Sequence, residues 1–139
     1  MKKLVFLFSV VVLFIACTNT VKKHVTEVHD NGAPKLISYY HYADNDSILV
    51  RDEWYYEDST LRMEGNYLDG QKNGTWVAYY PDGTPWSIGD FKDGLSHGSR
   101  TVYHENGEIY YTGQYTNDKR SGHWEFFNNK GEKVKEIDY

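Results

Sequence analysis

Six histidines are the side chains best suited to acid–base catalysis or metal binding in this sequence. They are His24, His29, His41, His97, His104 and His123. None of them has the HxxxH or HExxH spacing that places two ligands on one face of a helix, whereas zinc sites need three or four ligands on close, rigid elements. No Ser-His-Asp order, phosphate-binding glycine loop or paired-carboxylate motif accompanies them. The sequence therefore predicts a non-enzymatic protein without a metal or cofactor site.

Large aromatic side chains are the second group with a possible chemical role, because aromatic residues are enriched at binding interfaces. They make up 17% of the chain, with 13 Tyr and 4 Trp. Two sets recur at equal spacing and predict a candidate binding face. The first contains Trp76, Arg100 and Trp124, and the second contains Trp86 and Tyr110. The alternative, which the sequence leaves open, is that these side chains form a packed row covered by neighbouring parts of the fold.

Cys17 is the only cysteine of the chain, and it ends an N-terminal segment typical of secretion. Two lysines precede the apolar run Leu4 to Ile15, which is shorter than the about 20 residues of a membrane-spanning helix. The following residues, LFIAC, resemble the lipobox of bacterial lipoproteins, with Phe14 at the position where leucine is commonest. The resemblance implies cleavage before Cys17 and lipidation of its side chain.

We therefore expect residues 1–17 to be a lipoprotein signal segment, residues 18–24 a polar tether and residues 25–139 the folded domain. Without the signal segment, 13 basic and 20 acidic residues remain, a net charge of −7. This charge disfavours binding to nucleic acid and to anionic lipid surfaces. Thr18 follows the cysteine with no acidic run behind it, which resembles sorting to the outer membrane. The expected location is the cell envelope, lipid-anchored in the outer membrane and facing the periplasm.

A repeat with a period of 24 residues runs through the predicted domain. The turn sequence YYPDG at Tyr79 to Gly83 aligns without a gap with YYEDS, YHENG and FNNKG in the other units. Upstream, Asn31-Gly32 fits the same frame if three extra residues are allowed within residues 43–47. The array holds about four and a half units. Further positions that coincide are Gly65, Gly89 and Gly113; Tyr67, Phe91, Tyr115 and Tyr139; and Gly74, Gly98 and Gly122.

Each unit is predicted to be a β-hairpin, because two short runs rich in aromatic and β-branched residues flank a turn dipeptide. Pro81 lacks an N–H group, which favours a three-residue loop: a type I turn followed by Gly83 in the left-handed conformation. Ser59 replaces this glycine in the first full unit, so we expect its turn to be the most strained or the most altered. The other connection in each unit, such as Asp93 to Gly98, is predicted to be a longer polar loop.

The predicted fold is all-β, with tandem β-hairpins forming an elongated, single-layer antiparallel sheet. Helices are not expected, because no segment of 11 residues has helical apolar spacing without a glycine. The stability of such an array is close to a sum of nearest-neighbour terms. Two columns of rings are expected to stack across adjacent hairpins. They are Tyr55, Tyr79, Tyr103 and Phe127, and Tyr67, Phe91, Tyr115 and Tyr139.

The pattern Gly-x-Trp-x-x-Tyr-x-x-x-Gly followed by Gly-x-Phe-x-x-Gly, from Gly74 to Gly94, resembles the MORN repeat in its bacterial variant form. The resemblance covers about 100 residues. Departures are Arg100 at the tryptophan position, Asp118 at a glycine position and Ser59 at the turn. The family implies stacked hairpins without catalytic residues. For some bacterial members it also implies an antitoxin label or a membrane-associated scaffolding role.

These observations favour a membrane-anchored module that binds a protein partner, either a toxin acting in the envelope or another envelope protein. A second hypothesis is a module that binds glycan or peptidoglycan through exposed rings. The sequence leaves these two open.

Overall fold

The computed structural model describes residues 20–43 and 46–139, and this part of the chain contains ten β-strands and no helix. The strands are β1 (Thr20–Val28), β2 (Pro34–Ala43), β3 (Asp46–Tyr55), β4 (Leu61–Leu68), β5 (Gln71–Tyr79), β6 (Pro85–Lys92), β7 (Leu95–Tyr103), β8 (Ile109–Thr116), β9 (Lys119–Phe127) and β10 (Lys133–Asp138). Accordingly, no described helix is long and apolar enough to span a membrane.

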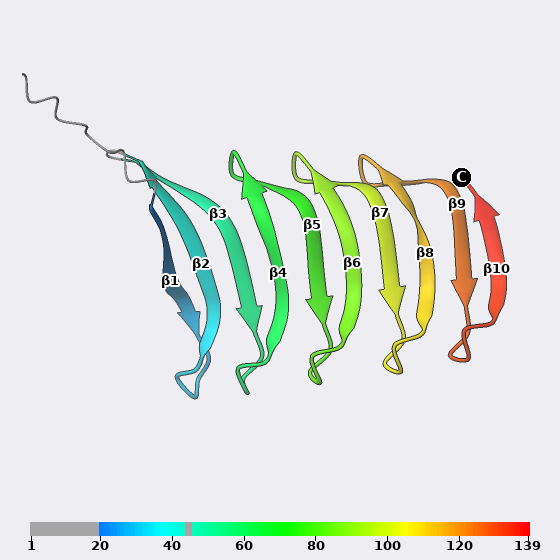
Figure 1. Cartoon of the computed structure of the whole chain (residues 1–139), viewed down its shortest axis with the longest axis horizontal. Helices are drawn as coiled ribbons and strands as arrows, with labels where there is room; N and C mark the ends of the chain where they lie inside the picture. The colour runs from blue at the N-terminus through cyan, green and yellow to red at the C-terminus, as the bar shows by residue number, and fades with distance from the viewer. Residues whose placement is uncertain (1–19, 44–45) are drawn as a thin grey trace, which may run out of the picture.

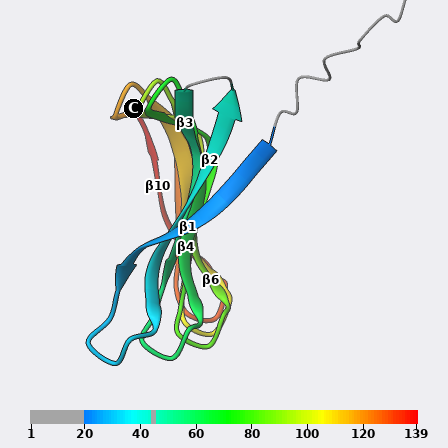
Figure 2. The same cartoon turned by 90° about the vertical axis from the view of Figure 1, so that its left-hand side faces the viewer.

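All ten strands form one antiparallel sheet in the order of the sequence, from β1 at one edge to β10 at the other (Figure 1). Seen from its side, the sheet is a single twisted layer, and β1 is turned away from the remaining strands (Figure 2). Twist of this kind follows from the steric preferences of L-amino acids. The prediction of tandem hairpins in an elongated, single-layer sheet is confirmed.

One end of the sheet is closed by the three-residue loops that the sequence predicted. After β5, the Tyr80 N–H donates to the Thr84 carbonyl at 2.8 Å and the Gly83 N–H donates to the Tyr80 carbonyl at 2.9 Å. Gly83 has a φ of 85°. The same pair of backbone bonds recurs in the loops after β1, β3, β7 and β9. The predicted type I turn with a left-handed residue is therefore confirmed.

Ser59 keeps this turn geometry at the expense of backbone strain. Its φ is 68°, and its N–H still donates to the Tyr56 carbonyl at 3.0 Å. Of the two predicted outcomes, strain without alteration is the one observed. The left-handed region carries a steric cost for a residue with a Cβ atom, which glycine does not have.

Replacing Ser59 with glycine is expected to raise the free energy of unfolding by about 0.5–1 kcal/mol, because relief of strain outweighs the extra entropy of the unfolded chain. Urea denaturation of the two proteins measures this difference. The reverse substitution Gly83→Ser should lower the stability by a similar amount. A Ser59→Gly variant no more stable than its parent would contradict the strain argument.

At the opposite end, two-residue turns join β4 to β5, β6 to β7 and β8 to β9, so the prediction of longer polar loops there is wrong. Lys92 pairs with Leu95, and only Asp93 and Gly94 stand between them, with φ values of 51° and 82°. Two consecutive positive φ values mark a type I′ turn, whose twist matches that of the flanking strands. Residues 95–98 continue as strand β7. Their polarity indicated a loop, but in a single-layer sheet a strand end can be polar on both faces.

The sheet also begins earlier than predicted. Residues 20–24, assigned to the tether, belong to β1, where Thr20 pairs with Tyr42 and Lys23 pairs with Tyr39. The tether prediction is wrong for these residues, because β1 is an edge strand exposed along its whole length and shows no apolar periodicity. Residues 18–19, and the predicted signal segment with Cys17, lie outside the described residues.

The core of the described chain is small and lies on one face of the sheet. Its buried apolar side chains are Trp76, Val102 and Trp124. All three point to the same face, since side chains alternate along each strand and these residues lie near or within the same row across the sheet. We call this side the aromatic face and the other side the polar face.

Rings on the aromatic face pack on the tryptophans between them. Trp76 lies between Tyr67 and Phe91, with ring centroids 5.3 and 5.9 Å away. The corresponding neighbours of Trp124 are Tyr115 and Tyr139, at 5.2 and 6.0 Å. The column therefore has the predicted packing role, but its members do not stack directly on one another, because Trp76, Arg100 and Trp124 lie between them.

The second predicted column lies on the polar face, and there the expected stacking is wrong. Among residues 46–139, no ring contact joins its members. Instead, the Tyr55 hydroxyl donates to Glu53 at 2.7 Å and the Tyr79 hydroxyl donates to Glu64 at 2.7 Å, while Arg51 pairs with both glutamates. Burial and the bond to Glu64 raise the pKa of Tyr79 to about 12.

Candidate binding site

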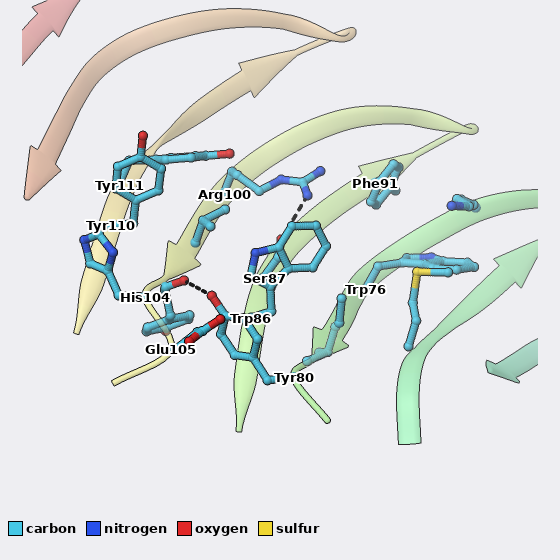
Figure 3. Close-up of a pocket in the computed structure, with 16 residues that line it drawn as sticks. Trp76, Tyr80, Trp86, Ser87, Phe91, Arg100, His104, Glu105, Tyr110 and Tyr111 are labelled. Atoms are coloured by element: carbon cyan, nitrogen blue, oxygen red, sulfur yellow. Dashed lines mark hydrogen bonds between the residues drawn. The ribbon is translucent and has the colours of Figure 1, made fainter. Parts of the chain in front are cut away.

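The aromatic face is hollowed in its middle by a cavity of about 650 Å³ that opens to solvent (Figure 3). Its lining includes the small side chains of Ala78, Ser87 and Val102. The outer repeats carry Trp54 and Phe126 at the positions of Ala78 and Val102. The hollow therefore exists because small residues stand in the middle repeats where larger rings stand at both ends.

Two exposed rings, Trp86 and Tyr110, reach this hollow from β-bulges. Tyr110 is the extra residue between Ile109 and Tyr111, which pair with consecutive residues of β7. Such a residue breaks the alternation of the strand. The Tyr110 and Tyr111 rings consequently lie together, with centroids 5.4 Å apart, and both line the hollow. Trp86 is the extra residue of the matching bulge in β6, and the two rings are 49% and 46% exposed.

Trp76 and Trp124 are buried, with exposed fractions of 4% and 0%, so neither presents an exposed ring to a ligand. Each indole lies across a glycine of the neighbouring strand: a Cβ atom on Gly65 would stand 2.1 Å from Trp76, and one on Gly113 would stand 2.2 Å from Trp124. They form the packed row that was the alternative interpretation. Trp76 contributes to the wall of the hollow, whereas Trp124 lies outside it.

Arg100 occupies the tryptophan position in the middle repeat and extends toward Phe91 across the hollow (Figure 3). Its Nη1 donates to the Ser87 hydroxyl at 3.2 Å, and its guanidinium carbon lies 5.5 Å from the Phe91 ring centroid. Lys72 stands nearby, with its ammonium 4.0 Å from the Trp76 ring centroid. Burial, together with the charge of Arg100, lowers the pKa of Lys72. The candidate site thus combines exposed rings with two half-buried cations.

A row of side-chain bonds ties each loop to the following hairpin at the lower rim of the hollow. The Tyr80 hydroxyl donates to the Tyr103 carbonyl at 2.8 Å, and His104 Nε2 donates to the Phe127 carbonyl at 3.1 Å. His29 and Tyr56 make the same bond to Tyr55 and Tyr79. We call these bonds loop straps. They hold adjacent hairpins in one arrangement and give His29 and His104 structural roles.

Two stretches of the chain, residues 72–93 and 96–117, match the family model described as MORN repeat variant. The chain thus contains two MORN repeats of the variant form. These two MORN repeats span β5 to β8 and supply most of the hollow. No curated protein matches the sequence. The predicted family is therefore confirmed, and MORN repeats are in general non-catalytic modules.

Four residues of the hollow were predicted from the sequence, namely Trp76, Arg100, Trp86 and Tyr110, and the others were missed. The missed residues that the site depends on are Lys72, Ser87 and Tyr111. A signal was present for Ser87, because it is the smallest residue in a column otherwise occupied by Met63, Tyr111 and Lys135. Lys72 gave no signal, since it stands in a segment that was predicted to be a loop.

Beyond the matched MORN repeats, the last hairpin gathers the described residues that could jointly ligate a metal: His123, Glu125 and Glu136, with ligand atoms within 4.8 Å of one another. Lys133 already lies among them, with its ammonium 2.7 Å from Glu136 and 3.2 Å from Glu125. His123 Nδ1 is 2.7 Å from Asp138. These exposed contacts join β10 to β9, and we assign them to attachment of the edge strand.

The hydrogen bond to Asp138, aided by Glu136 and Glu125, raises the pKa of His123. Protonation of His123 therefore favours the folded hairpin at low pH, and this contribution is lost as the pH rises through the raised pKa. We expect Asp138→Asn to lower the pKa of His123, measured by following its ring protons in an NMR titration. Asp93→Asn, in a distant turn, is the control that should leave it unchanged. Equal His123 pKa values in the parent and Asp138→Asn would refute this attribution.

Proposed function

We propose that this MORN-repeat chain is a non-enzymatic binding module, anchored to the cell envelope by lipid on Cys17, that presents its aromatic face to a partner protein. The observation that carries the proposal is the open hollow with Trp86 and Tyr110 exposed beside it. Exposed aromatic residues around a concave site are typical of interface anchors. The partner we favour is a toxin acting in the envelope or another envelope protein.

The anchor is supported by the LFIAC sequence at residues 13–17. Several acyl chains, at about 0.8 kcal/mol per buried methylene, would hold the chain on the membrane for its lifetime. We expect Cys17→Ala to lose incorporation of labelled palmitate, whereas Thr18→Ala keeps it. Equal labelling of the two variants, or no labelling of the parent, would refute the lipoprotein assignment.

Site-specific photo-cross-linking in intact cells tests the binding role. A benzophenone amino acid replaces Tyr110 at the hollow or, as the control, Gln114 on the polar face of the same strand, which is exposed. We expect one protein to be captured from position 110 and not from position 114. The same captured protein at both positions, or none at position 110, would count against the aromatic face as the interface.

A second candidate function, binding of glycan or peptidoglycan fragments, is favoured by the 49% exposure of Trp86. Sugar rings that pack on this indole would change its fluorescence. Titration with soluble cell-wall fragments should then quench the emission of the parent protein and not that of Trp86→Phe. An unchanged emission throughout the titration would remove this candidate.

A further inference from the structure

We infer that the hollow recognises an acidic side chain of the partner protein: a carboxylate is bound by Arg100 and Lys72, and an apolar side chain next to it packs on Trp86 and Tyr110. The inference rests on the proposed protein-binding function and adds the chemistry of the segment that is recognised.

Both cations of the hollow lack an ion pair within residues 20–43 and 46–139. Other cations of the sheet, such as Arg51 and Lys133, pair with glutamates. Arg100 contacts the Ser87 hydroxyl and two ring faces, and Lys72 contacts two ring faces. A guanidinium has five N–H donors, so most of those of Arg100 are available to a carboxylate in the planar, bidentate arrangement.

The nearby carboxylates of this chain are already engaged. Asp52, on the aromatic face, accepts bonds from Ser38 at 2.6 Å and from Tyr67 at 3.0 Å. Asp90 lies on the polar face, where the Ser99 hydroxyl donates to it at 2.6 Å. Neither forms an ion pair with Arg100 or Lys72. Asp52 attracts Lys72 and Asp90 attracts Arg100 from a distance, but neither carboxylate is within ion-pair distance, so both cations can still accept a carboxylate from a ligand.

The partly buried position of the two cations makes a carboxylate more favourable here than at an exposed lysine. Burial lowers the pKa of Lys72, and the nearby charge of Arg100 adds to this effect. A negative charge bound nearby favours the charged form of Lys72 and so opposes both effects on its pKa. Coulombic attraction is also stronger in a partly desolvated hollow than in bulk water.

The other side chains that line the hollow determine which groups of the ligand can pack beside the carboxylate. Val102 and Ala78 line it together with exposed rings, which suits an aliphatic or aromatic side chain. Glu105 is exposed on the same lining, and the chain as a whole has a net charge of −5. Both oppose a polyanion such as nucleic acid or a phosphate-rich surface. One carboxylate flanked by apolar side chains fits this lining best.

The test is selection of displayed random heptapeptides on the immobilised full chain in mild detergent. We expect selected peptides to carry Asp or Glu next to an aromatic or aliphatic residue. Binding of the best peptide, measured by Trp fluorescence, should weaken at least tenfold with Arg100→Gln. Arg62→Gln is the matched control, because Arg62 is an exposed arginine outside the hollow. Replacing the acid of the peptide by its amide should weaken binding to the parent as strongly, which requires no protein variant.

Selected peptides without acidic residues, or equal binding by the parent and Arg100→Gln, would overturn the inference while leaving a peptide-binding hollow and the proposed function in place. Failure to select any peptide would overturn it too. If position 110 then also captures no protein in cells, the proposed function fails with it. If Arg100→Gln does not fold, peptide binding is compared between the parent and Lys72→Gln instead.

Discussion

Replacing Trp124 with alanine is expected to lower the free energy of unfolding by about 3–5 kcal/mol, the range for truncation of a large buried aromatic residue. Trp124 is the one fully buried large side chain in the described part of the molecule. Its ring contacts Tyr115 and Tyr139 edge-on and also lies 5.6 Å from Tyr111 and 6.2 Å from Phe126. A single-layer sheet has no second layer to move into the space, so all these contacts are lost together.

Urea denaturation followed by circular dichroism measures this loss. The matched control is Trp86→Ala, which removes a half-exposed indole and should cost less than about 1 kcal/mol. We expect the two variants to separate stability from binding: Trp124→Ala unfolds more easily, whereas Trp86→Ala keeps its stability and loses the ligand. Similar stability losses in both variants would contradict the assignment of Trp124 to the core and Trp86 to the site.

Replacing Gly113 with alanine is expected to lower the free energy of unfolding by about 1–3 kcal/mol, because the added methyl group overpacks the core. The new Cβ atom would stand 2.2 Å from Cδ2 of the Trp124 ring. Rings on both sides hold that indole, so it cannot move away without breaking contacts. Either the ring or the backbone of β8 must shift.

Gly89→Ala is the matched control, because it makes the same change at the same place in the repeat. Its Cβ atom would stand 2.5 Å from Nε of Arg100, a flexible side chain that can move into the open hollow. The stability loss should therefore be smaller than for Gly113→Ala, while the displaced Arg100 should bind an acidic peptide more weakly. Equal stability losses in the two variants, compared by urea denaturation, would show that the indole yields as easily as the arginine.

The hairpins were predictable because their turns restrict the backbone strongly. Pro81 fixes its own φ, Gly83 readily adopts the positive φ that the loop requires, and the 24-residue period repeats this glycine at Gly107 and Gly131. The opposite turns were missed although Asp93-Gly94 is a dipeptide typical of type I′ turns, because the polar residues around it favoured a longer loop. Without that turn, the polar residues after it could not be recognised as the beginning of a strand.

The site was only partly predictable, because burial in a single layer depends on neighbours across the sheet. Trp76 is covered by rings from β4 and β6, and the glycine beneath it belongs to another strand. Which side chain covers which depends on register, and the bulges that carry Trp86 and Tyr110 change that register locally. Arg100, in contrast, could be identified from the sequence, because the neighbouring repeats have tryptophan at the same position.

The loop straps give the molecule two unlike ends. Every strap runs from a loop side chain of one hairpin to a backbone carbonyl of the next, so all straps point in one direction along the sheet. At the last position, Asn128 turns back and donates to Glu132 of its own loop at 2.8 Å. Among the described residues, Asn128 therefore does not continue the series of straps as a donor. Gene duplication could lengthen such a protein by copying an inner 24-residue segment, because each copy brings both halves of its connection.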